Sequence, residues 1–119
     1  MTLRPESELR EPSGVDPTHR ELIRAFMQGA VYSWVKNRPG EYFAVRDLVG
    51  GLNNNWNGTP LQVLYDRHIN AGKNAEEAFE SAAKDLGWIV KTLLSEDRRT
   101  FEWEKSGLVN TYLLVGDEL

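Results

Sequence analysis

The chain of 119 residues contains no cysteine, which excludes disulfide bonds, thiolate metal sites and a cysteine nucleophile. It has only two histidines, His19 and His68, and a histidine-rich metal site is therefore not expected. No apolar run is long enough to cross a membrane, and residues 1–5 do not begin a signal peptide. These absences predict a cytoplasmic protein without a bound metal or cofactor.

The composition is typical of one folded domain. Hydrophobic residues make up 40% of the chain and charged residues 27%. Residues 1–15 combine proline, glycine and charge without an apolar period, which predicts a flexible tail. The remainder, residues 16–116, is predicted to form a single domain with one core.

Charge is unevenly distributed along the chain. The net charge is −4, of which residues 1–16 and the last four residues each contribute −2. The body between them is neutral, and residues 17–40 within it carry a net charge of +3. Because clustering can attract a polyanion when total charge does not, the acidic balance does not exclude nucleic acid as a partner.

Four helical segments are predicted. Apolar residues at helical spacing between Leu22 and Val35 indicate a first helix over 17–37, capped either by Asp16 or by a Thr18–Glu21 capping box. Thr59 and Asn74 are the expected caps of two later helices. The remaining predicted segments are one or two helical turns over 46–49, a helix over 60–72 and a long helix over 74–94.

Extended structure is predicted in two places. Residues 41–45 form a short apolar run that is typical of a strand. Apolar and charged residues alternate over 100–104, and residues 108–115 are β-branched and aromatic, which together predict a C-terminal hairpin. We expect this hairpin to dock on the helices through Phe101 and Trp103.

This order of elements resembles the winged helix-turn-helix superfamily. The stretch 41–49 is similar to the superfamily's junction between a strand and its second helix, and residues 100–115 would be the wing. The resemblance implies a mostly helical α+β fold and binding to double-stranded DNA. The chain departs from the usual scheme of three helices, because it has an additional one over about 60–72.

Basic residues on the predicted helices and beside the wing are the candidates for phosphate contacts. Those on the wing are expected to be exposed. The acidic first turn of the long helix, which contains Glu76, Glu77 and Glu80, opposes insertion of that end into a groove. The candidate nucleic-acid-binding residues are Arg20, Arg24, Arg46, Lys84, Lys91, Arg98, Arg99 and Lys105.

Trp88 is the candidate partner-binding residue. Helical periodicity places it on the outer side of the long helix, between Lys84 and Lys91. An outward tryptophan can anchor a protein interface or stack on an unpaired base, and it can also be covered by another segment of the same chain.

No arrangement of residues predicts catalysis. Asp66 and His68 are two residues apart and point to different helix faces, and His68 is expected to be a core residue. Two functions therefore stay open: a small DNA-binding accessory or regulatory protein, as in transcription, or a module that binds protein, including a second copy of itself.

Overall fold

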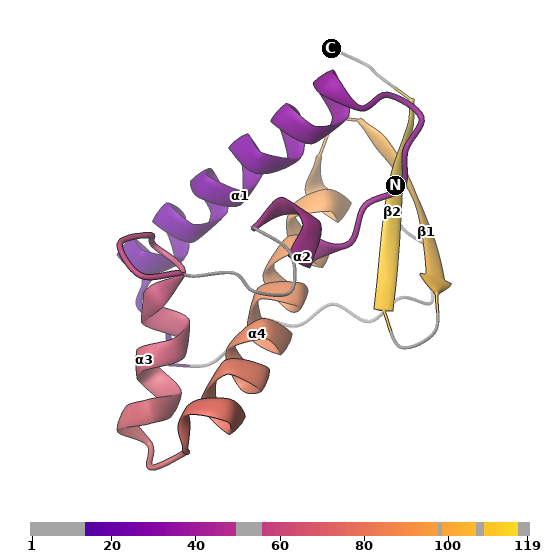
Figure 1. The fold of residues 1–119 in the computed structure, drawn as a ribbon. Helices are drawn as coiled ribbons and strands as arrows, with labels where there is room; N and C mark the ends of the chain where they lie inside the picture. Colours follow the sequence, from indigo (N-terminus) through magenta and orange to yellow (C-terminus); the bar gives the residue numbers. More distant parts are fainter. Residues whose placement is uncertain (1–13, 50–55, 98, 107–108, 117–119) are drawn as a thin grey trace.

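The computed structural model describes residues 14–49, 56–97, 99–106 and 109–116. These ranges hold four helices and one antiparallel hairpin (Figure 1). The elements are, in chain order, α1 Pro17–Asn37, α2 Val45–Leu48, α3 Gln62–Asn70, α4 Ala75–Glu96, β1 Thr100–Ser106 and β2 Val109–Gly116. The expectation of a mostly helical α+β protein with a C-terminal hairpin is confirmed.

The first helix has the predicted bounds, and the structure identifies its cap. The carboxylate of Asp16 accepts a hydrogen bond of 3.0 Å from the backbone N–H of His19, so Asp16 is the N-cap and Pro17 occupies the first turn. Buried residues recur every four positions along one face, namely Ile23, Met27, Val31 and Val35. This spacing keeps a single stripe of α1 against the core.

The third helix begins two residues later than the predicted start at 60. Thr59 does not cap a regular helix: its hydroxyl donates a 2.7 Å hydrogen bond to the Trp56 carbonyl and accepts one from the Leu61 N–H. These bonds hold residues 56–61 in a turn, and α3 starts only at Gln62. Trp56 itself is 5% exposed and packs on Phe79, and this contact holds the connection against the core.

The long fourth helix is capped as predicted. The Asn74 side chain accepts a hydrogen bond from the backbone N–H of Glu77, and the Glu77 carboxylate accepts one from the backbone N–H of Asn74. The helix runs to Glu96, two residues past the predicted end. In Figure 1, α3 lies beside the first half of α4, and the hairpin lies on the other side of α4.

The hairpin is confirmed, but the strand predicted over 41–45 is not. Only Phe43 pairs there, through two backbone hydrogen bonds of 2.8 Å with Tyr112 of β2. A longer strand cannot form, because Ala44 is already the N-cap of α2 and its N–H bonds to the Asp47 carboxylate. This single bridge nevertheless ties the stretch before α2 to the hairpin.

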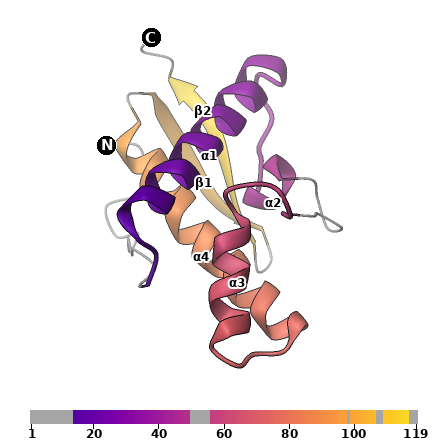
Figure 2. The same cartoon turned by 90° about the vertical axis from the view of Figure 1, so that its left-hand side faces the viewer.

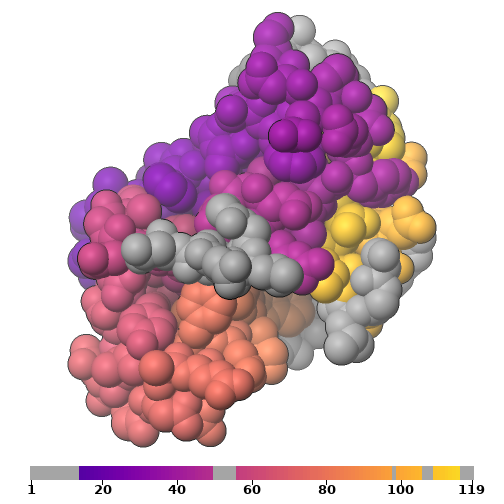
Figure 3. Space-filling model, viewed as in Figure 1, coloured from indigo at the N-terminus to yellow at the C-terminus, as the bar shows by residue number. Residues whose placement is uncertain are grey.

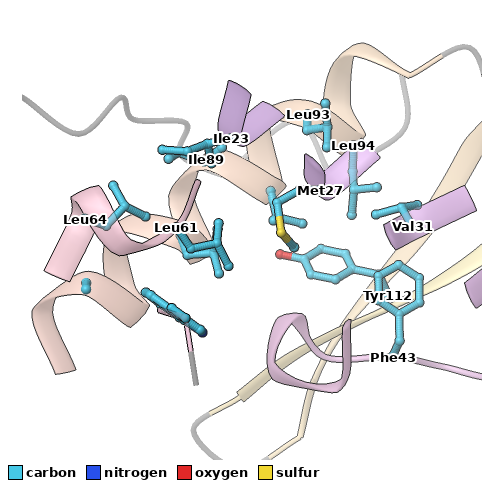
Figure 4. Close-up of a cluster of buried hydrophobic side chains, with 14 of the residues drawn as sticks. Ile23, Met27, Val31, Phe43, Leu61, Leu64, Ile89, Leu93, Leu94 and Tyr112 are labelled. Atoms are coloured by element: carbon cyan, nitrogen blue, oxygen red, sulfur yellow. The ribbon is translucent and has the colours of Figure 1, made fainter. Parts of the chain in front are cut away.

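The core lies between α1, α3, α4 and the inner face of the hairpin (Figure 4). Phe43 is fully buried, and its ring contacts those of Trp34, Phe101 and Tyr112. Of the two predicted docking rings, Phe101 is 2% exposed, whereas Trp103 is only partly buried. Figure 2 shows α1 crossing in front of the hairpin, and the contacts of Phe43 with Trp34 of α1 and with Phe101 of β1 connect the two.

Most of the predicted tail, residues 1–13, lies outside the described residues. Val15, within the predicted tail, is 7% exposed and belongs to the core. Its carbonyl accepts a hydrogen bond from the Arg20 guanidinium. The packed part of the chain therefore includes Val15, one residue before the expected start of the domain.

Candidate binding site

A cavity of about 540 Å³ opens between α2, α4 and β2. Its walls are mostly apolar: Val45 and Val49 come from the α2 region, Phe79 and Trp88 from α4, and Tyr112 from β2. Figure 3 shows atoms of these three elements meeting on one face of the molecule. The size and apolar lining are typical of a ligand-binding pocket.

Three of the predicted basic residues meet at this cavity. Arg46 at the start of α2 and Lys84 and Lys91 on α4 all line it. No aspartate or glutamate is among the described residues that line it. Within the described ranges, Arg46 and Lys84 take part in no ion pair, so their charges are available to an anion.

Trp88 also lines the cavity, where it is half-buried. The Lys91 ammonium lies 5.1 Å from the centre of its indole ring, within the range of a cation–π interaction. The expectation that Lys91 points outward is wrong, because the side chain is only 8% exposed. Lys91 packs its aliphatic stem into the cavity wall, a common arrangement for long cationic side chains.

The hairpin brings a fourth predicted cation close to the cavity. Lys105 of β1 is exposed and pairs directly with Asn110 of β2, which is a lining residue. Residues directly opposite each other in an antiparallel pair project from the same face of the sheet. The Lys105 side chain therefore lies on the side of the hairpin that borders the cavity.

The expected exposure of Arg99 is wrong. Its side chain is buried at 4% exposure, bonds to Asp97 and stacks on the Tyr32 ring at 3.7 Å. Sequence reasoning missed this because the ring that covers Arg99 comes from α1, far away in the chain. Arg98 lies outside the described residues.

Arg24 is also engaged within the protein. It forms an ion pair with Glu96 at the end of α4, and one turn further along α1 Gln28 donates a 2.9 Å hydrogen bond to Asp97. Tyr32, one turn beyond Gln28, stacks on Arg99. The side of α1 next to α4 therefore makes three contacts with the α4–β1 junction, through Arg24, Gln28 and Tyr32. Arg24 and Arg99 are thus engaged in contacts that join α1 to the α4–β1 junction.

Asp97 is the acceptor at the centre of this junction. Burial alone would raise the pKa of its carboxyl group, because a charge is costly away from water. Hydrogen bonds from the Arg99 backbone, Gln28 and the Arg99 side chain, together with the guanidinium charge, outweigh burial and hold the pKa below the ordinary value of 3.8. Asp97 is therefore ionised at neutral pH and holds Arg99 in place.

Burial raises the pKa of Tyr112 to about 12, against an ordinary value of 10.0. In the unfolded chain this phenol ionises above pH 10, while in the folded protein it keeps its proton. We therefore expect the free energy of unfolding to fall by about 2 kcal/mol between pH 10 and 12 from this group. Urea unfolding of the wild type and Tyr112→Phe across this range checks it, and an equal fall in both would contradict the assignment.

A polar network between α3 and α4 was not predicted. His68 Nε2 lies 2.8 Å from the Asp85 carboxylate, and the Lys73 ammonium lies 3.1 Å from His68 Nδ1 and 2.8 Å from the Ser81 hydroxyl. Arg67 also pairs with Asp85. The side chains of Arg67, His68 and Asp85 are at most 22% exposed. We therefore infer that the network holds α3 against α4. His68 is partly buried on the side of α3 that faces α4, but it belongs to this polar network and not to the apolar core.

Among the described residues, no group of three or more acidic or histidine side chains is arranged to hold a metal ion. Within the same residues, no helix combines the length and the apolar character needed to span a membrane. Comparisons with protein-family models, with curated proteins and with solved structures find no match for this chain.

Proposed function

We propose that this protein is a small, non-catalytic, winged-helix-like module that binds double-stranded DNA as an accessory or regulatory factor. The observation that carries the proposal is the convergence of Arg46, Lys84 and Lys91 on one cavity without a described carboxylate in its lining. Cations grouped in this way release counterions from a phosphate backbone, which is the main source of sequence-independent affinity.

The arrangement of elements supports the winged-helix interpretation. The bridge between Phe43 and Tyr112 attaches the stretch before α2 to the hairpin, as expected for a junction between a strand and a second helix. Arg46 on α2, Lys84 on α4 and Lys105 on the hairpin then border one face. In this proposal the side chains from the three elements contact phosphates on that face, with α4 nearest the duplex.

Acidic residues limit where the DNA can lie. Glu76, Glu80, Lys84 and Trp88 follow one another at four-residue spacing and share one face of α4. The N-terminal half of this face is acidic, so a duplex is repelled there and must lie over the half that begins at Lys84. Replacing Glu80 with glutamine should therefore strengthen binding.

The proposal predicts a salt dependence with a definite slope. Three phosphate contacts, from Arg46, Lys84 and Lys105, give a log–log slope of about −3 for affinity against salt. Replacing Arg46 and Lys84 together with glutamine should make the slope shallower by about two units, because both cations leave the interface. Fluorescence anisotropy with a random duplex of about 20 base pairs, titrated at several salt concentrations, measures this.

Arg38→Gln is the control, because it removes an exposed positive charge at the end of α1 that does not line the cavity. Its slope should stay within about half a unit of the wild type. Absence of binding at low salt would overturn the proposal. An unchanged slope in the Arg46 and Lys84 double variant would also overturn it.

A further inference from the structure

The outer face of α1 is apolar and uncovered within the described structure. Leu22 is 50% exposed and Phe26 is 40% exposed. Ala25, Gly29 and Ser33 are exposed on the same side, opposite the buried stripe of the helix. The stripe formed by these five residues carries no charge, which is unusual for the solvent side of a helix.

Gly29 has no role in packing within the described part of the chain. A Cβ atom added to it would meet nothing within 4 Å, so no neighbour requires the small residue. Glycine in the middle of a helix is also less favourable than alanine. A glycine on an exposed helix face does, however, allow the backbone of a second helix to approach closely.

We propose that the outer face of α1 binds the same face of a second copy of this chain, with the two helices antiparallel and crossing at Gly29. In this dimer Leu22 and Phe26 pack beside the Gly29 crossing and are removed from water. The apolar area that is otherwise exposed provides the driving force for association.

The charges at the ends of the stripe favour this antiparallel orientation. Glu21 and Lys36 lie eight and seven residues from Gly29, on opposite sides, and neither takes part in an ion pair within the described ranges. An antiparallel crossing at Gly29 brings Glu21 close to Lys36 of the partner subunit at both ends. A parallel pair would instead bring like charges together.

The dimer is compatible with DNA binding and does not depend on it. None of the residues that line the cavity belongs to α1, so both cavities stay open in the dimer. A single pair of helices of this length, about 30 Å, buries an area at the low end of specific interfaces. We therefore expect reversible association in the micromolar range.

Sedimentation equilibrium of the full chain between about 2 and about 200 µM tests the proposal. The wild type should change from monomer to dimer over this range. Phe26→Glu should weaken association at least about tenfold, because it buries an unpaired charge in the interface. Val115→Glu makes a similar change at a side chain on β2 that is 47% exposed, and it should leave association unchanged.

A charge swap and a substitution at Gly29 test the geometry, and circular dichroism confirms that each variant folds. Glu21→Lys and Lys36→Glu should each weaken association, and the double variant should restore it. Gly29→Ala should raise the thermal midpoint of the dilute monomer and weaken the dimer, opposite effects that a purely structural role would not produce. A monomer at every concentration would overturn the proposal, and so would equal effects of Phe26→Glu and Val115→Glu or a failed charge swap.

Discussion

Replacing Phe43 with alanine is expected to lower the free energy of unfolding by about 3–5 kcal/mol. The ring is fully buried, and its centroid lies 6.0 Å from that of Trp34 on α1 and 5.8 Å from that of Tyr112 on β2. Alanine leaves a cavity where α1, the stretch before α2 and the hairpin meet, and it removes these aromatic contacts. Urea unfolding followed by tryptophan fluorescence measures the change.

The adjacent residue provides the control for this substitution. Tyr42 is 39% exposed, and its hydroxyl donates a hydrogen bond to Glu102 on the hairpin. Tyr42→Ala removes a ring of nearly the same size from the same segment and should cost less than about 1 kcal/mol. Similar losses from the two variants would show that Phe43 does not join the hairpin to the helices.

Replacing Arg99 with methionine is expected to cost about 3 kcal/mol, because it leaves a buried carboxylate without its cation. The Asp97 side chain is 2% exposed, so water cannot take the place of the guanidinium. The hydrogen bonds from Gln28 and the Arg99 backbone remain, and they keep the loss near the lower end of the range for broken buried ion pairs.

A double variant separates this cost from a general packing defect. In Asp97→Asn with Arg99→Met the charge is gone, while the amide oxygen still accepts from the Arg99 backbone N–H. Most of the lost stability should return, as it does when both members of a buried pair are neutralised. If the double variant is as unstable as the sum of the two single variants, the ion pair does not explain the effect.

The sequence by itself determines the helices and the hairpin of this protein. The caps Asp16 and Asn74 and the apolar periods behind them are local signals, and α1 and α4 begin where those signals place them. Hydrogen bonding in a first turn depends on residues only two or three positions apart. The alternation of apolar and charged residues that begins at Phe101 is also a local signal, and it was sufficient to predict β1.

Where two local signals compete, the sequence alone was not sufficient to predict the secondary structure. Residues 41–45 have the composition of a strand, but the Asp47 carboxylate caps the Ala44 N–H and begins a helix there. Threonine is a common N-cap residue, yet the Thr59 hydroxyl donates its hydrogen bond to the Trp56 carbonyl and holds a turn. Each outcome depends on which of two nearby partners a polar group takes, a choice that residue type leaves open.

Only the tertiary structure decided which basic residues face outward. Arg99 and Arg46 are both arginines near predicted element boundaries, and nothing local distinguishes them. Arg99 is buried because Tyr32 and Asp97 enclose its guanidinium, whereas Arg46 lines a cavity formed by α2, α4 and β2. Whether an arginine is enclosed depends on the contacts around it, and one of the partners of Arg99 comes from a helix nearly seventy residues earlier in the chain. Local periodicity contains no information about such contacts.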